Sequence, residues 1–123
     1  MRTIEQLDRN SFKAAIESNA VVIIDFWADW CEPCMQFTPI FAQVAEAHTA
    51  IKFGMVNIDT TPEIAEFFNV KQVPCVLCIR DQVVIDAVVG EMKARELSHH
   101  IEMWTAFDNS AINAHFDAKL VAN

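Results

Sequence analysis

The fold is decided by the stretch Val21-Val22-Ile23-Ile24-Asp25-Phe26-Trp27-Ala28-Asp29-Trp30-Cys31-Glu32-Pro33-Cys34. Its first seven residues form an apolar run that predicts a buried strand over 21–27. The residues after Cys34 have helical spacing, and Pro33 suits the first turn of a helix. The stretch therefore carries two thiols from the end of a strand to the start of a helix.

Two cysteines three positions apart on a helix have Cα atoms roughly 5 Å apart. That separation lies within the range that a disulfide spans. The helix N-terminus also carries partial positive charge and unpaired N–H groups, which favour a thiolate. We therefore expect reversible disulfide chemistry at Cys31 and Cys34, with the pKa of Cys31 lowered and its sulfur exposed. Zinc and iron–sulfur sites also use a Cys-x-x-Cys pair, so a metal site stays open at this point.

The composition is that of one globular domain with a sizeable core, because 53% of the 123 residues are hydrophobic. A formal net charge of −8 argues against nucleic acid and anionic membrane surfaces as partners. No apolar run approaches the roughly 20 residues of a membrane span. Charges interrupt the N-terminal residues, so no signal-peptide core is recognised and we expect a cytoplasmic protein.

The pattern beyond the opening stretch alternates strands and helices, which predicts an α/β fold with a central mixed β-sheet flanked by helices. Asn10 or Ser11 caps a first helix, and a short edge strand can precede it. The long helix from Pro33 has its apolar positions at Phe37, Ile40, Phe41, Val44, Ala45 and His48. The expected order then continues with strand 51–58, a helix opened by Thr61-Pro62 with Ile64, Phe67 and Phe68 inward, strands 73–79 and 83–89, and helix 93–104.

Residues along most of the chain resemble the thioredoxin family. The resemblance rests on segment 25–34, Pro39, segment 56–59, Val73-Pro74 and Val89-Gly90. It covers roughly residues 10–105 and implies a thioredoxin fold.

The resemblance also implies roles for individual residues. Cys31 would attack a client disulfide, Cys34 would resolve the mixed disulfide, and Asp25 would handle the proton of Cys34. A carboxyl in an apolar strand should have a raised pKa, which suits that task. The implied substrate-docking residues are Trp30, Pro33, Ile58, Val73, cis-Pro74, Val89 and Gly90.

The implied function is a thiol–disulfide oxidoreductase that reduces protein disulfides. Its partners would be disulfide-containing client proteins and a thioredoxin-reductase-type electron donor, and no metal or organic cofactor is implied. The alternative is a chaperone or adapter module that keeps the fold and binds a client through its docking surface.

A second pair of cysteines, Cys75 and Cys78, lies in a predicted strand. Residues three apart on a strand point to opposite faces, with Cα atoms roughly 10 Å apart. That geometry opposes both a Cys75–Cys78 disulfide and a four-cysteine metal site. We expect Cys78 to be a packing residue and Cys75 to be either inert or a third redox thiol.

Three positions depart from the family pattern. Glu32 replaces the usual glycine, and its carboxylate should disfavour the Cys31 thiolate, so we expect Glu32→Gly to make the redox potential less negative. Met55 replaces a lysine near the buried carboxylate, which should leave the pKa of Asp25 higher still. Asp81-Gln82 replaces an Asn-Gly hairpin turn, so we expect a longer or rearranged loop there.

The family pattern ends near residue 107, which predicts a thioredoxin domain over 1–107 and an extension over 108–123. Ser110 can cap a helix with Ile112, Phe116 and Leu120 on one stripe. That stripe would pack on its own domain, so we expect a monomer, or a weak dimer through this tail.

Overall fold

The computed structural model describes residues 4–106 of the chain. The predicted boundary at residue 107, the extension 108–123 and the helix capped by Ser110 lie outside the described residues. The elements in chain order are β1 (Glu5–Gln6), α1 (Arg9–Ser18), β2 (Val21–Trp27), α2 (Glu32–Glu46), β3 (Lys52–Asn57), α3 (Pro62–Phe67), β4 (Cys75–Arg80), β5 (Val83–Val89) and α4 (Ala94–Ala106).

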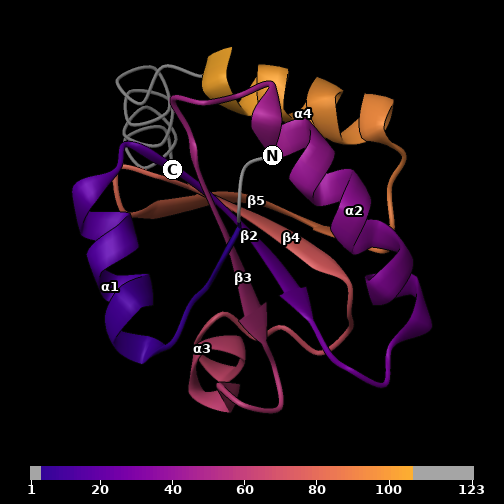
Figure 1. The fold of residues 1–123 in the computed structure, drawn as a ribbon. Coiled ribbons are helices and arrows are strands. Elements are labelled where there is room, and N and C mark those ends of the chain that lie inside the picture. Colours follow the sequence, from indigo (N-terminus) through magenta and orange to yellow (C-terminus); the bar gives the residue numbers. More distant parts are fainter. Residues whose placement is uncertain (1–3, 107–123) are drawn as a thin grey trace, which may run out of the picture.

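The strands form one sheet in the order β1-β3-β2-β4-β5 (Figure 1). β1, β3 and β2 run parallel, whereas β4 pairs antiparallel with both β2 and β5. The mixed sheet of a thioredoxin fold is therefore confirmed. Its central strand, β2, ends directly before the segment that carries Cys31 and Cys34.

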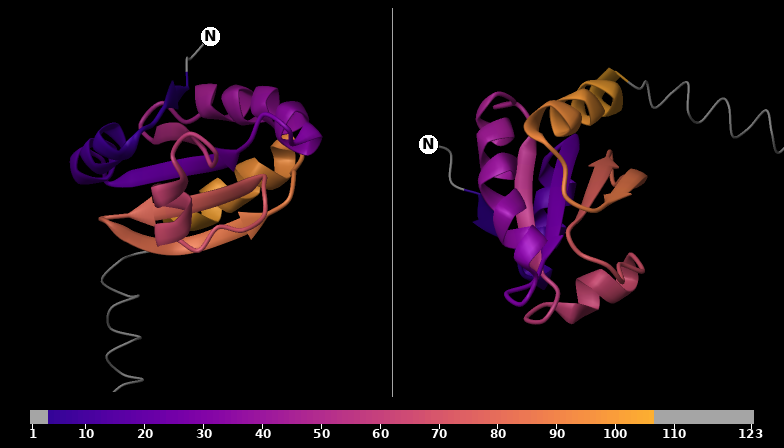
Figure 2. Two further views of the ribbon diagram at one scale, coloured as in Figure 1. Left: turned by 90° about the horizontal axis from the view of Figure 1, so that it is seen from below. Right: turned by 90° about the vertical axis from the view of Figure 1, so that its right-hand side faces the viewer.

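Helices cover both faces of the sheet, and each face has its own apolar cluster (Figures 1 and 2). Phe37 and Phe41 of α2 pack with Leu97 and Trp104 of α4 against one face. Phe12 of α1 and Ile64 of α3 pack against the other face. This layering buries β2 on both sides, which is why six of its seven residues are apolar, Asp25 being the exception. No helix within residues 4–106 is long and apolar enough to cross a membrane.

The strands predicted over 21–27 and 83–89 have those bounds in the structure. Two details of the helices differ from expectation. Asp8, not Asn10 or Ser11, caps α1, because its carboxylate accepts from the N–H of Ser11 (2.8 Å) and Ser11 bonds back in a capping box. The long helix ends at Glu46, so His48 lies beyond it.

Phe67 was predicted to face inward, and this is wrong, because the residue is 81% exposed. Its neighbour Phe68 turns toward the core instead and contacts the rings of Phe12 (centroids 5.6 Å apart) and Phe26 (6.5 Å). Phe68 directly follows the helix, and the inward positions predicted for it and for Ile64 are confirmed.

The predicted longer loop at Asp81-Gln82 is also wrong. The two residues alone join β4 to β5, with φ of 49° at Asp81 and 68° at Gln82. Positive φ at both central positions is the geometry of a type I′ hairpin turn. The tight turn is therefore kept, although it holds the backbone of two non-glycine residues in the left-handed region.

Candidate active site

Cys31 and Cys34 are joined by a disulfide at the start of α2, with their Cα atoms 5.2 Å apart. Cys31 is the N-cap of the helix, and its Sγ accepts from the N–H of Cys34 (3.2 Å). Pro33 occupies the first turn, where a missing N–H removes no helical hydrogen bond. The helix N-terminus thus directs a backbone donor at the sulfur of Cys31, which favours the thiolate once the disulfide is reduced.

The expectation of an exposed Cys31 sulfur is wrong for this state. The residue is 5% exposed, and Cys34 is fully buried. Both pack with Ala28, and the half-buried Trp27, Ile58 and Val73 close around them. The first cysteine is therefore reached through a narrow opening, which restricts the groups that can approach its sulfur.

Asp25 is fully buried in β2, six residues before Cys31. Neither carboxylate oxygen has a hydrogen-bond partner among the described residues. Burial raises the pKa of Asp25 well above its usual range. The carboxyl thus keeps its proton to a higher pH than an ordinary aspartate does, a perturbation typical of functional sites.

The peptide bond between Val73 and Pro74 is cis, as the resemblance implied. The carbonyl oxygen of Val73 lies 3.7 Å from Sγ of Cys31. Pro74 is buried, and its carbonyl accepts from the N–H of Gly90 (2.8 Å), where φ is +102°. The structure thereby brings three segments together at the disulfide: the start of α2, the Val73–Pro74 turn and the end of β5.

Apolar side chains surround this opening. Trp30 is 69% exposed, and its indole N–H donates to the carboxylate of Asp59 (2.9 Å). Val89 is 57% exposed, Pro33 is exposed, and Ile58 is half-buried. The predicted docking residues therefore lie at one end of the sheet, the end at which β2 and β3 finish and α3 begins (Figure 1).

Cys75 and Cys78 are both free and buried. Cys75 belongs to the cluster beneath α1 and α3, whereas Cys78 belongs to the cluster beneath α2 and α4. Their opposite faces agree with the strand geometry, so a shared metal or a mutual disulfide is ruled out. Burial raises the pKa of Cys75 and raises that of Cys78 to about 12, so both remain thiols at neutral pH.

A sequence model of the Thioredoxin family matches residues 3–103. The chain belongs to the thioredoxin family. Its Cys31–Cys34 pair occupies the Cys-x-x-Cys active site, and the chain is a thiol–disulfide oxidoreductase.

Two curated relatives and one solved structure illustrate the similarity. The putative thioredoxin 2 of Streptomyces coelicolor is 35% identical over 98 residues, which are 80% of this chain and 73% of that relative. The thioredoxin of Buchnera aphidicola is 30% identical over 102 residues, 82% of this chain and 94% of that relative. Among solved structures, the thioredoxin of Malassezia sympodialis superposes with a TM-score of 0.78 at 28% identity, covering 86% of this chain and 94% of that one.

The resemblance assigned no role to Asn57, whose side chain fixes the loop after β3 beside the disulfide. The side chain of Asn57, at the end of β3, accepts from the N–H of Asp59 (2.8 Å) and so turns the chain toward Trp30. The N–H of Ile58 donates to the carbonyl of Trp27 (2.9 Å), which ties the same loop to the end of β2. The signal in the sequence is the Asn-x-Asp spacing, which is typical of a side chain that bonds the backbone two residues on.

Proposed function

We propose that this thioredoxin reduces disulfides in proteins and is itself re-reduced by a thioredoxin-reductase-type donor. The observation that carries the proposal is the disulfide at the N-terminus of α2, with the Val73 carbonyl 3.7 Å from Sγ of Cys31. That arrangement places a reactive sulfur beside the backbone of the Val73–Pro74 turn. A client segment can therefore be held while its disulfide is attacked.

The reaction begins with the reduced dithiol. The thiolate of Cys31 attacks one sulfur of the client disulfide, which forms a mixed disulfide and releases the other client sulfur as a thiolate. Cys34 then loses its proton and attacks Sγ of Cys31. This step restores the Cys31–Cys34 disulfide and releases the second client thiol. Two electrons pass to the client, and the donor returns two electrons and two protons to the pair.

Asp25 is proposed as the group that takes the proton of Cys34. It lies on β2 behind the pair, and its buried carboxyl has no hydrogen-bond partner in the described part of the chain. A raised pKa makes the Asp25 carboxylate a stronger base than an ordinary aspartate. Cys34 is fully buried, so a proton acceptor within the protein is needed where water is excluded.

The client is proposed to lie across the opening at the end of the sheet. The Val73 backbone pairs with an extended client segment, Pro74 faces the two sulfurs, and the remaining contacts come from Trp30, Pro33, Ile58, Val89 and Gly90. The support is the exposure of Trp30 and Val89 beside a nearly buried disulfide. An exposed apolar rim of this kind is typical of a protein-binding surface.

We further place the protein in the cytoplasm, where thiols are kept reduced. We also propose that it acts as a monomer, with a weak dimer through residues 108–123 as the alternative. Molar mass by light scattering across a range of protein concentrations separates the two states.

The proposal is tested by insulin reduction with a thioredoxin reductase and NADPH. The wild-type chain should reduce insulin, Cys31→Ser should be inactive, and Cys78→Ala should retain activity as a matched cysteine control. A wild-type chain that binds unfolded clients but leaves insulin oxidised would instead support the adapter reading. The same assay with Asp25→Asn should show slower turnover, with the loss confined to the step in which Cys34 resolves the mixed disulfide.

A further inference from the structure

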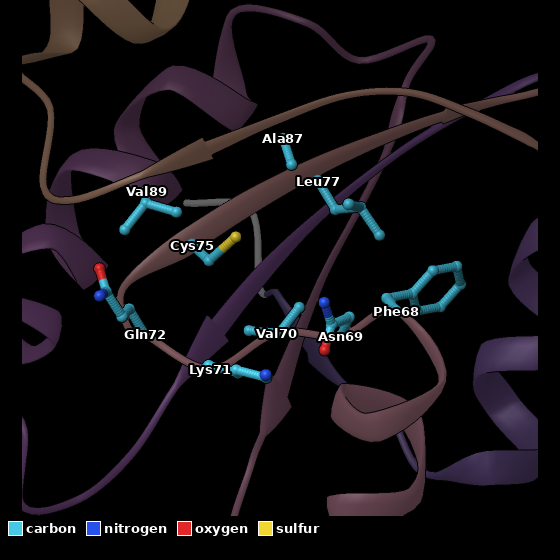
Figure 3. Close-up of a pocket in the computed structure, with 9 residues that line it drawn as sticks. All are labelled: Phe68, Asn69, Val70, Lys71, Gln72, Cys75, Leu77, Ala87 and Val89. Atoms are coloured by element: carbon cyan, nitrogen blue, oxygen red, sulfur yellow. The ribbon is translucent and has the colours of Figure 1, made fainter.

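A pocket of about 240 Å³ lies on the sheet beside the active site, on the face that carries α1 and α3 (Figure 3). β4 supplies Cys75 and Leu77, and β5 supplies Ala87 and Val89. The segment that joins α3 to β4 closes the other side, with Phe68 and Val70 facing the pocket. The lining residues therefore all come from the stretch 68–89, which folds back on itself at the β4–β5 turn.

The pocket exists because the helical layer on this face stops short of β5. The strand register pairs Cys75 with Val89 and Leu77 with Ala87, so all four side chains share the face. Cys75 and Leu77 are buried beneath the layer, whereas Ala87 and Val89 are exposed and belong to neither apolar cluster. The result is a half-covered apolar hollow at the edge of the sheet.

The rim of the pocket is polar. Asn69, Lys71 and Gln72 line it, and Lys71 is its charged lining residue. This cation stands out in a chain whose formal net charge is −8. An apolar floor with a few polar groups at the mouth is the usual composition of a binding pocket.

The pocket adjoins the two segments that lie beside the disulfide, the Val73–Pro74 turn and the end of β5. Cys75 directly follows Pro74, and the Pro74 carbonyl is bonded to Gly90, the residue after Val89. Val73, whose carbonyl lies beside Sγ of Cys31, is one residue from Gln72 on the rim. A polypeptide held by the Val73 backbone with its cysteine at Cys31 therefore passes the mouth of the pocket.

We propose that this pocket is a client-specificity subsite, which takes one apolar side chain of the client polypeptide from within a few residues of its reacting cysteine. Lys71 at the rim favours an acidic residue next to that apolar one. The inference rests on the proposed function, because it requires a polypeptide client. It adds that the chain distinguishes between clients through a client side chain near, but separate from, the reacting cysteine.

The test uses the full chain and a set of short synthetic peptides, each with one cysteine in a disulfide with thionitrobenzoate, whose release is followed by absorbance. Leucine replaces serine at one position at a time, from five residues before the cysteine to five after it. We expect one position at which leucine raises kcat/KM about tenfold, which is the scale of filling an apolar pocket. Ala87→Lys, which places a charged chain in the pocket, should remove that preference. Val83→Lys serves as the control, because Val83 is an exposed residue of the same strand outside the pocket lining.

The outcomes distinguish failure of the proposed subsite from failure of the proposed reductase function. Equal rates for every peptide, with insulin still reduced, would overturn the subsite and leave the reductase intact. The same result is expected if residues 107–123 or a second copy of the chain fill the pocket. A leucine preference that persists in Ala87→Lys would also overturn it. Failure to reduce both insulin and the peptides would reject the proposed function, and the subsite with it.

Discussion

Asp25 and Met55 are partners across the β2–β3 ladder, in the interior of the sheet. Both are buried, and Sδ of Met55 accepts from the side-chain amide of Gln6 (3.4 Å). Residue 55, where the family pattern has a lysine, is therefore an uncharged methionine that offers Asp25 no positive charge. Within residues 4–106, a carboxylate in this place has neither a hydrogen bond nor a counter-charge, which explains why burial alone governs the pKa of Asp25.

Asp25→Asn should make the stability of the oxidised protein less dependent on pH. Because the folded-state pKa of Asp25 lies above its unfolded value near 3.9, the folded protein binds the extra proton. The protonated Asp25 therefore contributes to the free energy of unfolding at low pH. This contribution is lost as the pH rises from about 4 to the pKa of Asp25 in the folded protein. Across that window, the free energy of unfolding of Asp25→Asn should rise relative to that of the wild type by up to ~1.4 kcal/mol per pH unit. Urea unfolding of both proteins at a series of pH values measures this, and a constant difference would contradict it.

Met55→Lys should lower the pKa of Asp25, because a cation beside the carboxylate favours its ionised form. The pH at which Cys34 resolves a mixed disulfide should then move downward. Rapid-mixing kinetics with a single client disulfide, followed from pH 5 to 9, gives the profile. Met55→Leu conserves the volume without adding charge and should leave the profile in place. Identical profiles for the two variants would show that the residue at 55 does not act through charge.

Glu32→Gln should make the redox potential of the pair less negative. Glu32 is exposed in the first turn of α2, next to Cys31, where its carboxylate disfavours the thiolate of the reduced form. Repulsion between two exposed like charges is worth ~0.2–1 kcal/mol, which is about 5–20 mV for a two-electron couple. Equilibration with glutathione measures the potential. Glu63→Gln, in the first turn of α3, is the matched control and should not shift it.

Gln82→Gly should stabilise the fold. Gln82 has φ of 68°, which costs a residue with a Cβ but not glycine. We expect a gain of about 0.5–1 kcal/mol, seen as a rise of a few degrees in Tm. Gln72 is also exposed but has no positive φ, so Gln72→Gly should give no gain. Equal effects at the two positions would mean that the turn is not strained.

The elements that the sequence predicted best are those with long, regular apolar patterns. β2 is apolar except at Asp25 because it is covered on both faces, and α2 shows helical spacing through Phe37, Phe41 and Val44. The separation of Cys31 and Cys34 follows from their spacing, because i and i+3 on a helix set it, whereas their separate roles came from the resemblance. The cis peptide at Pro74 came from the resemblance, since X–Pro bonds are mostly trans.

What the sequence could not predict depends on contacts between distant residues. Phe67 and Phe68 have the same character, and only the rings of Phe12 and Phe26 decide which one faces inward. The low exposure of Cys31 arises from Val73 and Ile58, which the fold brings from other elements. The pocket beside Cys75 is likewise invisible in sequence, because its lining comes from two strands and a connecting segment.

The central claim is that Cys31 attacks a protein disulfide and Cys34 resolves the intermediate. Reduced Cys34→Ser should therefore remain attached to an oxidised client such as insulin, and peptide mapping by mass spectrometry should find the client on Cys31. The adduct should be absent from the Cys31→Ser, Cys34→Ser double variant. Attachment through Cys75 or Cys78, or no covalent complex at all, would contradict the account.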